Sequence, residues 1–228
     1  WDEAADAYRR GFEMEPDFRW WFYGICWEAL IKAGKLPEIE DFFLEFLKNN
    51  PQSFWAYLNV GEALTRQGKT EEAAIYYKSA CYQQTLKNNP EFVKKYWEIG
   101  QLRSPEFAVI GVNKGGTTSL YGYLIQHPQV IAPIKKEMDF WSWKFNDSIN
   151  WYKSHFPPIP EGVNFVTGEA SPSYFDYREA PSRLFNAFPK VKLILLLRNP
   201  VDRAVSQYHH CIRLNWDNRQ MEEVFNSD

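Results

Sequence analysis

A loop that combines one lysine, two glycines and three hydroxyl residues is the first part of this sequence that could do chemistry. It lies within the stretch GVNKGGTTSLYGYL, residues 111–124. Gly115 and Gly116 permit a tight turn that brings backbone N–H groups close to a ligand. A predicted helix then opens with free amides at its positive end and with the hydroxyls of Thr117, Thr118 and Ser119. Because Lys114 stands in the same loop, the pattern predicts a cradle for a phosphate group.

The order of these residues separates the loop from the triphosphate-binding pattern G-x-x-x-x-G-K-[ST], in which lysine follows the glycines and a hydroxyl binds magnesium. Here Lys114 precedes Gly115. This order suits a nucleotide 5'-phosphate bound without a metal better than it suits a triphosphate. A P-loop nucleotide kinase remains an alternative, and it would need an acidic magnesium ligand that the sequence does not reveal. The three cysteines and four histidines have no metal-ligand spacing, so we expect no metal site.

A second cation and hydroxyl occur in the stretch LILLLRNPVDRAVSQYHH, residues 193–210. Arg198 ends a predicted strand, and the Asn-Pro pair after it is typical of a helix start. Ser206 lies off the apolar stripe of that helix, so Arg198 and Ser206 could hold a second phosphate together. An arginine at a strand end can instead form a structural ion pair. One nucleotide that carries both a 5' and a 3' phosphate would explain both motifs.

Strands followed at once by helices must position these two motifs. Continuous apolar runs over residues 107–112 and 191–197 predict strands buried on both faces, and residues 164–169 predict a weaker third strand. Strands that alternate with helices indicate an α/β domain with a parallel sheet. Ligands of such sheets bind beyond the carboxyl ends of the strands, where both motifs stand.

The first hundred residues follow a different pattern, with a period of 34 residues. Gly34-Lys35 and Gly68-Lys69 are one period apart, and prolines at positions 16, 51 and 90 each follow a predicted second helix. This resembles the tetratricopeptide repeat, so we expect all-α helical repeats with a capping helix over residues 1–103. The repeats could bind a protein partner, or they could be a structural extension packed on the next domain.

Together, the two chemical motifs resemble the 5'-phosphosulfate loop and the R-x-P-x-x-R-x-x-S motif of the sulfotransferase superfamily, in particular its heparan-type and bacterial synthase-associated branch. The second motif matches at Arg198, Pro200, Arg203 and Ser206. The resemblance implies that residues 106–228 form the N-terminal part of a truncated sulfotransferase domain, whose C-terminal part is missing. It also implies the co-substrate 3'-phosphoadenosine 5'-phosphosulfate. The residues expected to bind it are Lys114, Gly115, Gly116, Thr117, Thr118, Ser119, Arg198 and Ser206.

A catalytic base is implied by the stretch APIKKEMDFWSW, residues 132–143, which resembles the K-E-x-x-F-F-like segment of this branch. Glu137 would remove the proton of an acceptor hydroxyl during in-line displacement. Lys114 would stabilise the charge that develops on the leaving phosphate. The alternative for Glu137 is a solvated carboxylate beside two lysines. Ala170 occupies a place where glycan-sulfating relatives often carry lysine, which argues against a heparan-like acceptor.

Bulk composition limits the partners. A net charge of −3 over 228 residues gives no general surface for nucleic acid. No apolar run approaches the ~20 residues of a membrane span. Since neither disulfides nor targeting signals are visible, we expect a cytoplasmic protein. Trp1 is not a natural start, so we also expect that the true N-terminus is missing.

The sequence thus predicts sulfuryl transfer to an acceptor hydroxyl, with a glycan, a lipid or carrier-bound group, and a protein side chain all open as acceptors. A different class of function also remains open. The chain could be a non-catalytic repeat scaffold that retains a nucleotide-binding, sulfotransferase-like domain.

Overall fold

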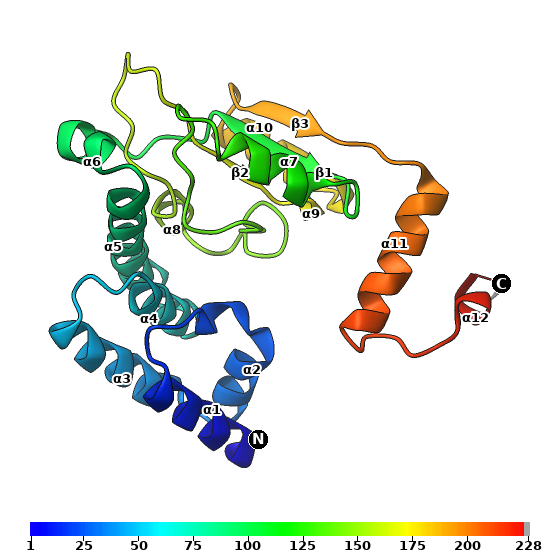
Figure 1. The fold of residues 1–228 in the computed structure, drawn as a ribbon, viewed down its shortest axis with the longest axis horizontal. Helices are drawn as coiled ribbons and strands as arrows, with labels where there is room; N and C mark the ends of the chain where they lie inside the picture. Colours follow the sequence, from blue (N-terminus) through cyan, green and yellow to red (C-terminus); the bar gives the residue numbers. More distant parts are fainter. Residues whose placement is uncertain (226–228) are drawn as a thin grey trace.

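A helical first half precedes a small parallel sheet in the computed structural model, which describes residues 1–225 (Figure 1). Helices that follow one another in the chain pack together, as the predicted repeat requires, and α4 packs mainly on α3 and α5. Gly34 and Gly68 lie two residues after the ends of α2 and α4, with φ angles of 68° and 77° that only glycine adopts without strain. The helices of this half are α1 (Asp2–Met14), α2 (Gly24–Lys32), α3 (Leu36–Asn49), α4 (Phe54–Arg66), α5 (Thr70–Asn88) and α6 (Pro90–Tyr96).

Close approach of α4 and α5 depends on one small residue. A Cβ atom added at Gly61 would lie 2.6 Å from the ring of Tyr77, so any larger side chain would push the two helices apart. The Ser53 hydroxyl accepts the backbone N–H of Ala56 and caps α4. The expected all-α repeat is therefore confirmed, and α6 follows α5 as the last helix of this half.

The second half contains three parallel strands in the order β2-β1-β3. The strands are β1 (Phe107–Gly111), β2 (Gly168–Ala170) and β3 (Lys192–Leu195). Phe107 pairs with Gly168 on one side and with Lys192 on the other, so all three carboxyl ends point to the same edge. The predicted parallel sheet is confirmed. The strand predicted over residues 164–169 is β2. It is shorter than predicted and begins later, because Val166 forms only an isolated bridge to Val130.

Short helices connect and flank these strands. Their bounds are α7 (Thr117–Leu124), α8 (Ile149–Lys153), α9 (Ser173–Asp176), α10 (Ala180–Ala187), α11 (Pro200–Arg213) and α12 (Met221–Phe225). Among residues 1–225, no helix is both long and apolar enough to cross a membrane.

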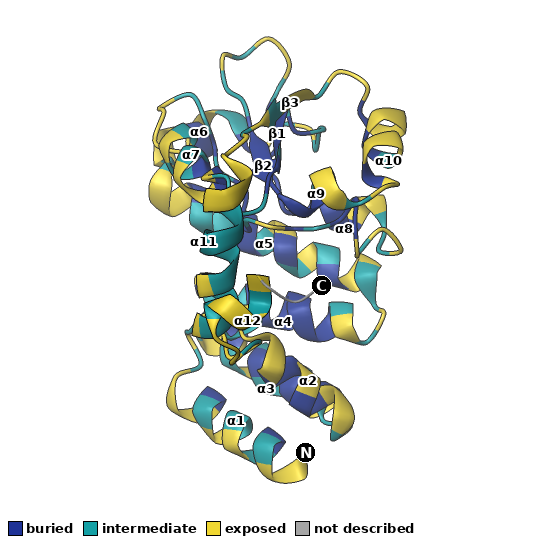
Figure 2. Ribbon diagram, turned by 90° about the vertical axis from the view of Figure 1, so that its right-hand side faces the viewer, coloured by how far each residue is buried: buried dark blue, intermediate teal, exposed yellow. Residues whose placement is uncertain are grey.

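One prediction about β3 is wrong. We expected residues 191–197 to form a strand buried on both faces, but Leu193 and Leu195 are 54% and 42% exposed. The following helix, α11, has no buried residue and runs away from the sheet (Figures 1 and 2). The apolar pattern correctly gives an extended strand followed by a helix. Burial depends on neighbours, and β1 is the only strand among the described residues that pairs with β3.

A continuous apolar core joins the two halves. One cluster of contacting buried residues extends from Ala5 in α1 to Phe188 after α10. It includes Tyr77 of α5 and Trp151 of α8, whose rings meet edge to face at 5.8 Å. One side of the helical repeats is therefore packed against the segment that leads into the sheet.

Beneath the sheet lies a fully buried carboxyl group, that of Glu169 in β2. It accepts hydrogen bonds from the hydroxyls of Tyr152, Ser171 and Tyr174. Burial raises the pKa of Glu169 to about 7, although the three hydroxyls oppose this shift. Ser171 also accepts the backbone N–H of Asp139, so the network holds the segment that carries Glu137. The complete burial of Glu169 makes it part of the core.

The buried carboxyl predicts a pH-dependent stability. Because its pKa is near 7 in the folded chain and near 4.5 when unfolded, the folded state binds more protons between these values. The contribution of Glu169 is thus fully present below pH 4.5 and decreases through pH 7, by about 3 kcal/mol. Urea unfolding between pH 4.5 and 7.5 should show this loss in the native chain but not in Glu169→Gln. The exposed control Glu161→Gln should keep it. An identical pH slope in the native chain and Glu169→Gln would contradict the assignment.

Candidate functional site

A cavity of about 390 Å³ opens at the carboxyl ends of β1 and β3. Seven of the nine predicted site residues line it, namely Lys114, Gly116, Thr117, Thr118, Glu137, Arg198 and Ser206. Gly115 and Ser119 are not among the lining residues. The two motifs and the candidate base, which are far apart in the sequence, therefore meet at one place.

The first motif forms a tight turn between β1 and α7. Gly116 precedes α7 with a φ angle of 99°, and Lys114 has a φ angle of 64°. Such a left-handed conformation costs a lysine about 1–2 kcal/mol and persists only where its surroundings enforce it. The first amides of α7 have no partner within the helix, so they are available to an anion. Thr117, the first residue of the helix, is buried.

Gly115 has a packing role. A Cβ atom added there would lie 2.9 Å from the carbonyl oxygens of both Leu196 and Val112. The turn is therefore pressed against the residues that follow β3, and glycine is needed for this approach. Ser119 is exposed on α7. Its placement outside the cavity leaves its predicted contact with the nucleotide without geometric support.

A hydrogen bond joins the two motifs directly. Arg198 donates from Nη1 to the carbonyl oxygen of Lys114, at 3.2 Å. Because β1 and β3 are neighbours, the tip of each strand lies within reach of the other. Ser206 approaches the same cavity from α11, whose first turn is capped by the side chain of Asn199.

Four lining residues were missed by sequence reasoning: Asn113, Pro172, His210 and Arg213. A signal for two of them existed, because His210 and Arg213 follow Ser206 at spacings of four and seven and so share its helix face. Burial lowers the pKa of His210, and the Lys114 ammonium lowers it further. Arg203, the remaining cation of the matched motif, does not line the cavity.

Glu137 is held in the cavity wall by its own backbone. Its φ angle is 61°, and its N–H donates to the carbonyl oxygen of Ala170 at the end of β2, at 2.9 Å. The side chain is half exposed and forms an ion pair with Lys136. The two lysines before Glu137 therefore differ in exposure. The Lys136 side chain is partly exposed, whereas Lys135 is buried. A carboxylate and several cations consequently line one cavity.

This arrangement suits an anion with more than one phosphate group. Lys114, Arg198 and Arg213 supply three cations, and the start of α7 adds backbone donors. Glu137 supplies the only carboxylate among the lining residues. Within residues 1–225, no cluster of three or more histidine, cysteine or carboxylate groups could hold a metal ion.

Both halves of the chain are similar to known protein families. A family model described as sulfotransferase domain matches residues 104–227, and one described as tetratricopeptide repeat matches residues 42–74. The membrane-associated sulfotransferase kil1 of Dictyostelium discoideum is 43% identical over 48% of this chain and 23% of its own length. Heparan sulfate glucosamine 3-O-sulfotransferase 6 of Homo sapiens is 41% identical over 48% of this chain and 31% of its own length.

A solved structure of a sulfotransferase from Alicyclobacillus acidocaldarius is also similar, at 34% identity. The match covers 53% of this chain and 55% of that one, with a TM-score of 0.47. The matched regions amount to only 23% and 31% of the length of the two curated relatives. Because the family match covers residues 104–227 of 228, more than half of the sequence, the chain belongs to the sulfotransferase domain family.

Proposed function

We propose that the cavity binds 3'-phosphoadenosine 5'-phosphosulfate and that the protein transfers its sulfuryl group to an acceptor hydroxyl. The observation that carries this proposal is the contact between Arg198 and the Lys114 carbonyl, which unites the two anion-binding motifs. A nucleotide phosphorylated at both ends of one ribose needs two such positions in a single cavity. Membership of the sulfotransferase domain family supports the same reading.

The two ends of the nucleotide would be held by different groups. The turn at Gly116 and the first amides of α7 would bind the 5'-phosphosulfate, together with the hydroxyls of Thr117 and Thr118. Arg198 and Ser206 would bind the 3'-phosphate. Arg213 lines the same cavity and would add a further positive charge.

Transfer would proceed by in-line displacement at sulfur. The acceptor oxygen forms a new S–O bond while the bond between sulfur and the 5'-phosphate oxygen breaks. Glu137 takes the proton of the acceptor hydroxyl, and Lys114 stabilises the negative charge on the leaving phosphate. The products are a sulfate ester and adenosine 3',5'-bisphosphate.

The acceptor is proposed only as a hydroxyl-bearing molecule, whether a glycan, a lipid or a carrier-bound group. Ala170 is fully buried, and its carbonyl holds the Glu137 backbone.

A cytoplasmic location and a division into helical repeats over 1–103 and a sulfotransferase domain from 106 stay predictions. A protein partner of the repeats also stays a proposal, with a cavity of about 580 Å³ among α3, α4 and α5 as its candidate position.

Donor binding should depend on both strand tips. Lys114→Ala and Arg198→Ala should each weaken binding of adenosine 3',5'-bisphosphate at least tenfold, about 1.4 kcal/mol, because each removes one cation from the cavity. Isothermal titration would measure this. Lys190→Ala, which removes an exposed lysine outside the cavity, should bind normally. If both cavity variants bound within twofold of the native protein, the two-phosphate proposal would be wrong.

Glu137→Gln should separate catalysis from binding. Loss of the base should lower kcat for sulfuryl transfer by roughly 100-fold or more, while affinity for adenosine 3',5'-bisphosphate stays within about twofold. Radiolabelled donor would report the transfer. Glu91→Gln, at an exposed glutamate in α6, serves as the control. A Glu137→Gln enzyme of native kcat would remove Glu137 from the mechanism, and the non-catalytic alternative predicts no transfer by either protein.

Chelation should leave donor binding unchanged. The proposed contacts are all made by protein cations, amides and hydroxyls, so excess EDTA should not alter the Kd of adenosine 3',5'-bisphosphate by more than twofold. A P-loop kinase would instead need magnesium for its nucleotide. Restoration of binding by added Mg²⁺ after chelation would favour the kinase alternative.

A further inference from the structure

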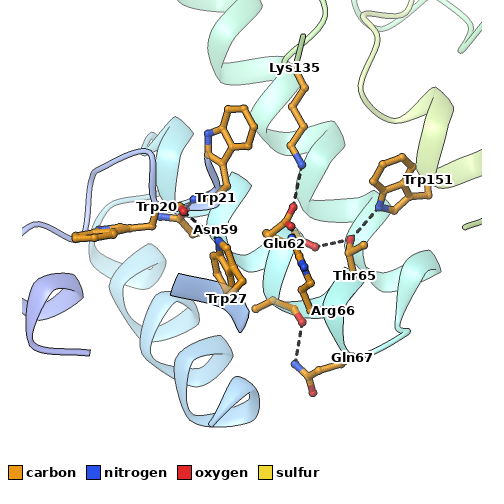
Figure 3. A network of polar contacts seen from close by, with 12 residues as sticks. Trp20, Trp21, Trp27, Asn59, Glu62, Thr65, Arg66, Gln67, Lys135 and Trp151 are labelled. Atoms are coloured by element: carbon orange, nitrogen blue, oxygen red, sulfur yellow. Dashed lines mark hydrogen bonds and ion pairs between the residues drawn. The ribbon is translucent and has the colours of Figure 1, made fainter. Parts of the chain in front are cut away.

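A buried ion pair joins the helical repeats to the segment that carries the candidate base. Lys135 is 4% exposed and Glu62 of α4 is 3% exposed, with Nζ and Oε2 3.0 Å apart (Figure 3). The two residues are 73 positions apart in the sequence. Lys135 thus reaches from the loop into the repeat, two residues before Glu137.

The surroundings of this pair satisfy nearly all of its polar groups. Lys135 also donates to the Tyr77 hydroxyl at 3.3 Å, and its ammonium lies 5.0 Å from the Trp21 ring. The other carboxylate oxygen of Glu62 accepts from Arg66 at 2.8 Å. Buried charges persist only when paired in this way, so each partner depends on the other.

The charges around the pair come from several elements. Burial would raise the pKa of Glu62, but Lys135, Lys144 and Arg66 together hold it well below its usual value. Burial lowers the pKa of Lys135 to about 8, although Glu62 opposes this. Asp147 and the neutral, buried His155 also face this region. Glu62 is therefore an anion throughout the physiological range, ready to hold a cation from the loop.

Further contacts hold the residues just before Lys135. Gln84 of α5 donates to the carbonyl oxygens of Ala132 and Pro133, at 3.3 and 3.1 Å. The Ile134 N–H donates to the carbonyl oxygen of His155. Residues 132–135 therefore lie against the repeat and α8, and the chain then passes directly to the cavity.

Glu137 is consequently fixed from two sides. On one side, the ion pair anchors Lys135 in the repeat. On the other, Ala170 at the end of β2 accepts the Glu137 N–H. Between these anchors, Glu137 keeps a left-handed φ angle of 61° that a glutamate does not adopt freely.

We propose that Lys135 is a positioning residue, whose ion pair with Glu62 holds the Lys136-Glu137 segment at the cavity and makes the helical repeat a working part of the reaction site. This inference rests on the proposed function, because it assigns Lys135 a role in placing the base. It goes beyond that function because it assigns the repeat a role in positioning the candidate base of the same chain.

A purely structural ion pair would behave differently. Removal of Lys135 alone leaves Glu62 with Arg66 as its remaining ion-pair partner and should destabilise the whole fold. Removal of both charges relieves that penalty, yet it does not restore the tether. A double variant can therefore separate stability from positioning.

The test compares Lys135→Met, Glu62→Gln/Lys135→Met and a control. The control, Lys69→Met, removes another ion pair between helical elements, that of Lys69 with Glu40 at 2.9 Å, which does not contact the loop. Four quantities are measured: amide hydrogen exchange of residues 136–139, kcat for sulfuryl transfer, the Kd of adenosine 3',5'-bisphosphate, and the melting temperature.

In the double variant, we expect exchange of residues 136–139 to accelerate at least tenfold and kcat to decrease at least tenfold, with Kd within threefold. Its melting temperature should be closer to native than that of Lys135→Met. The control should change none of these. Native exchange or native kcat in the folded double variant would overturn the proposal. If the native protein transferred no sulfuryl group, the proposed function would fail, and the exchange measurement would still decide whether the tether exists.

Discussion

Parallel pairing of β1 with β3 is the constraint on which the site depends. It places two strand ends at one edge of the sheet, where the loop after β1 and the arginine after β3 come into contact. The turn at Gly115 packs directly on the carbonyl of Leu196, so no larger residue fits between the two loops. The cations of Lys114 and Arg198 would repel each other in an empty cavity. Their proximity is therefore maintained by backbone pairing and favours a ligand with two negative groups.

The candidate base reaches this edge from a different direction. Its segment crosses between the helical repeat and β2, and buried polar groups hold it on both sides. Glu62 lies on the repeat side, and on the sheet side the hydroxyl of Ser171 links the Asp139 backbone to the buried Glu169. Buried hydrogen-bonded groups are costly to leave unpaired, so they fix a segment more strictly than apolar contacts do. The segment has little regular structure of its own, and these contacts take the place of a helix or strand.

Burial is unevenly distributed over the sheet. β1 and β2 lie within the apolar core, whereas β3 and α11 expose leucine and valine side chains. In α11, Ser206, His210 and Arg213 face the cavity, while Val201 and Val205 line a separate apolar groove with Met221 and Phe225 of α12. The polar face of the helix thus contributes to the site although its apolar face remains largely uncovered. The residues at the strand ends and in the turns still line one cavity, because local backbone geometry sets their positions.

The sequence by itself determined the features that depend on neighbours in the chain. Glycine and hydroxyl spacing gave the anion loop, the 34-residue period gave the repeats, and apolar runs gave β1 and β3. Tertiary structure alone decided which lysine beside Glu137 is buried, because Lys135 and Lys136 differ only in what packs around them. It likewise decided that β3 is exposed and that Tyr152, 17 positions from Glu169, joins the nearby hydroxyls of Ser171 and Tyr174 around that carboxyl group. Burial and charge pairing depend on contacts between residues that are distant in the sequence, and local sequence patterns do not show which distant residues meet.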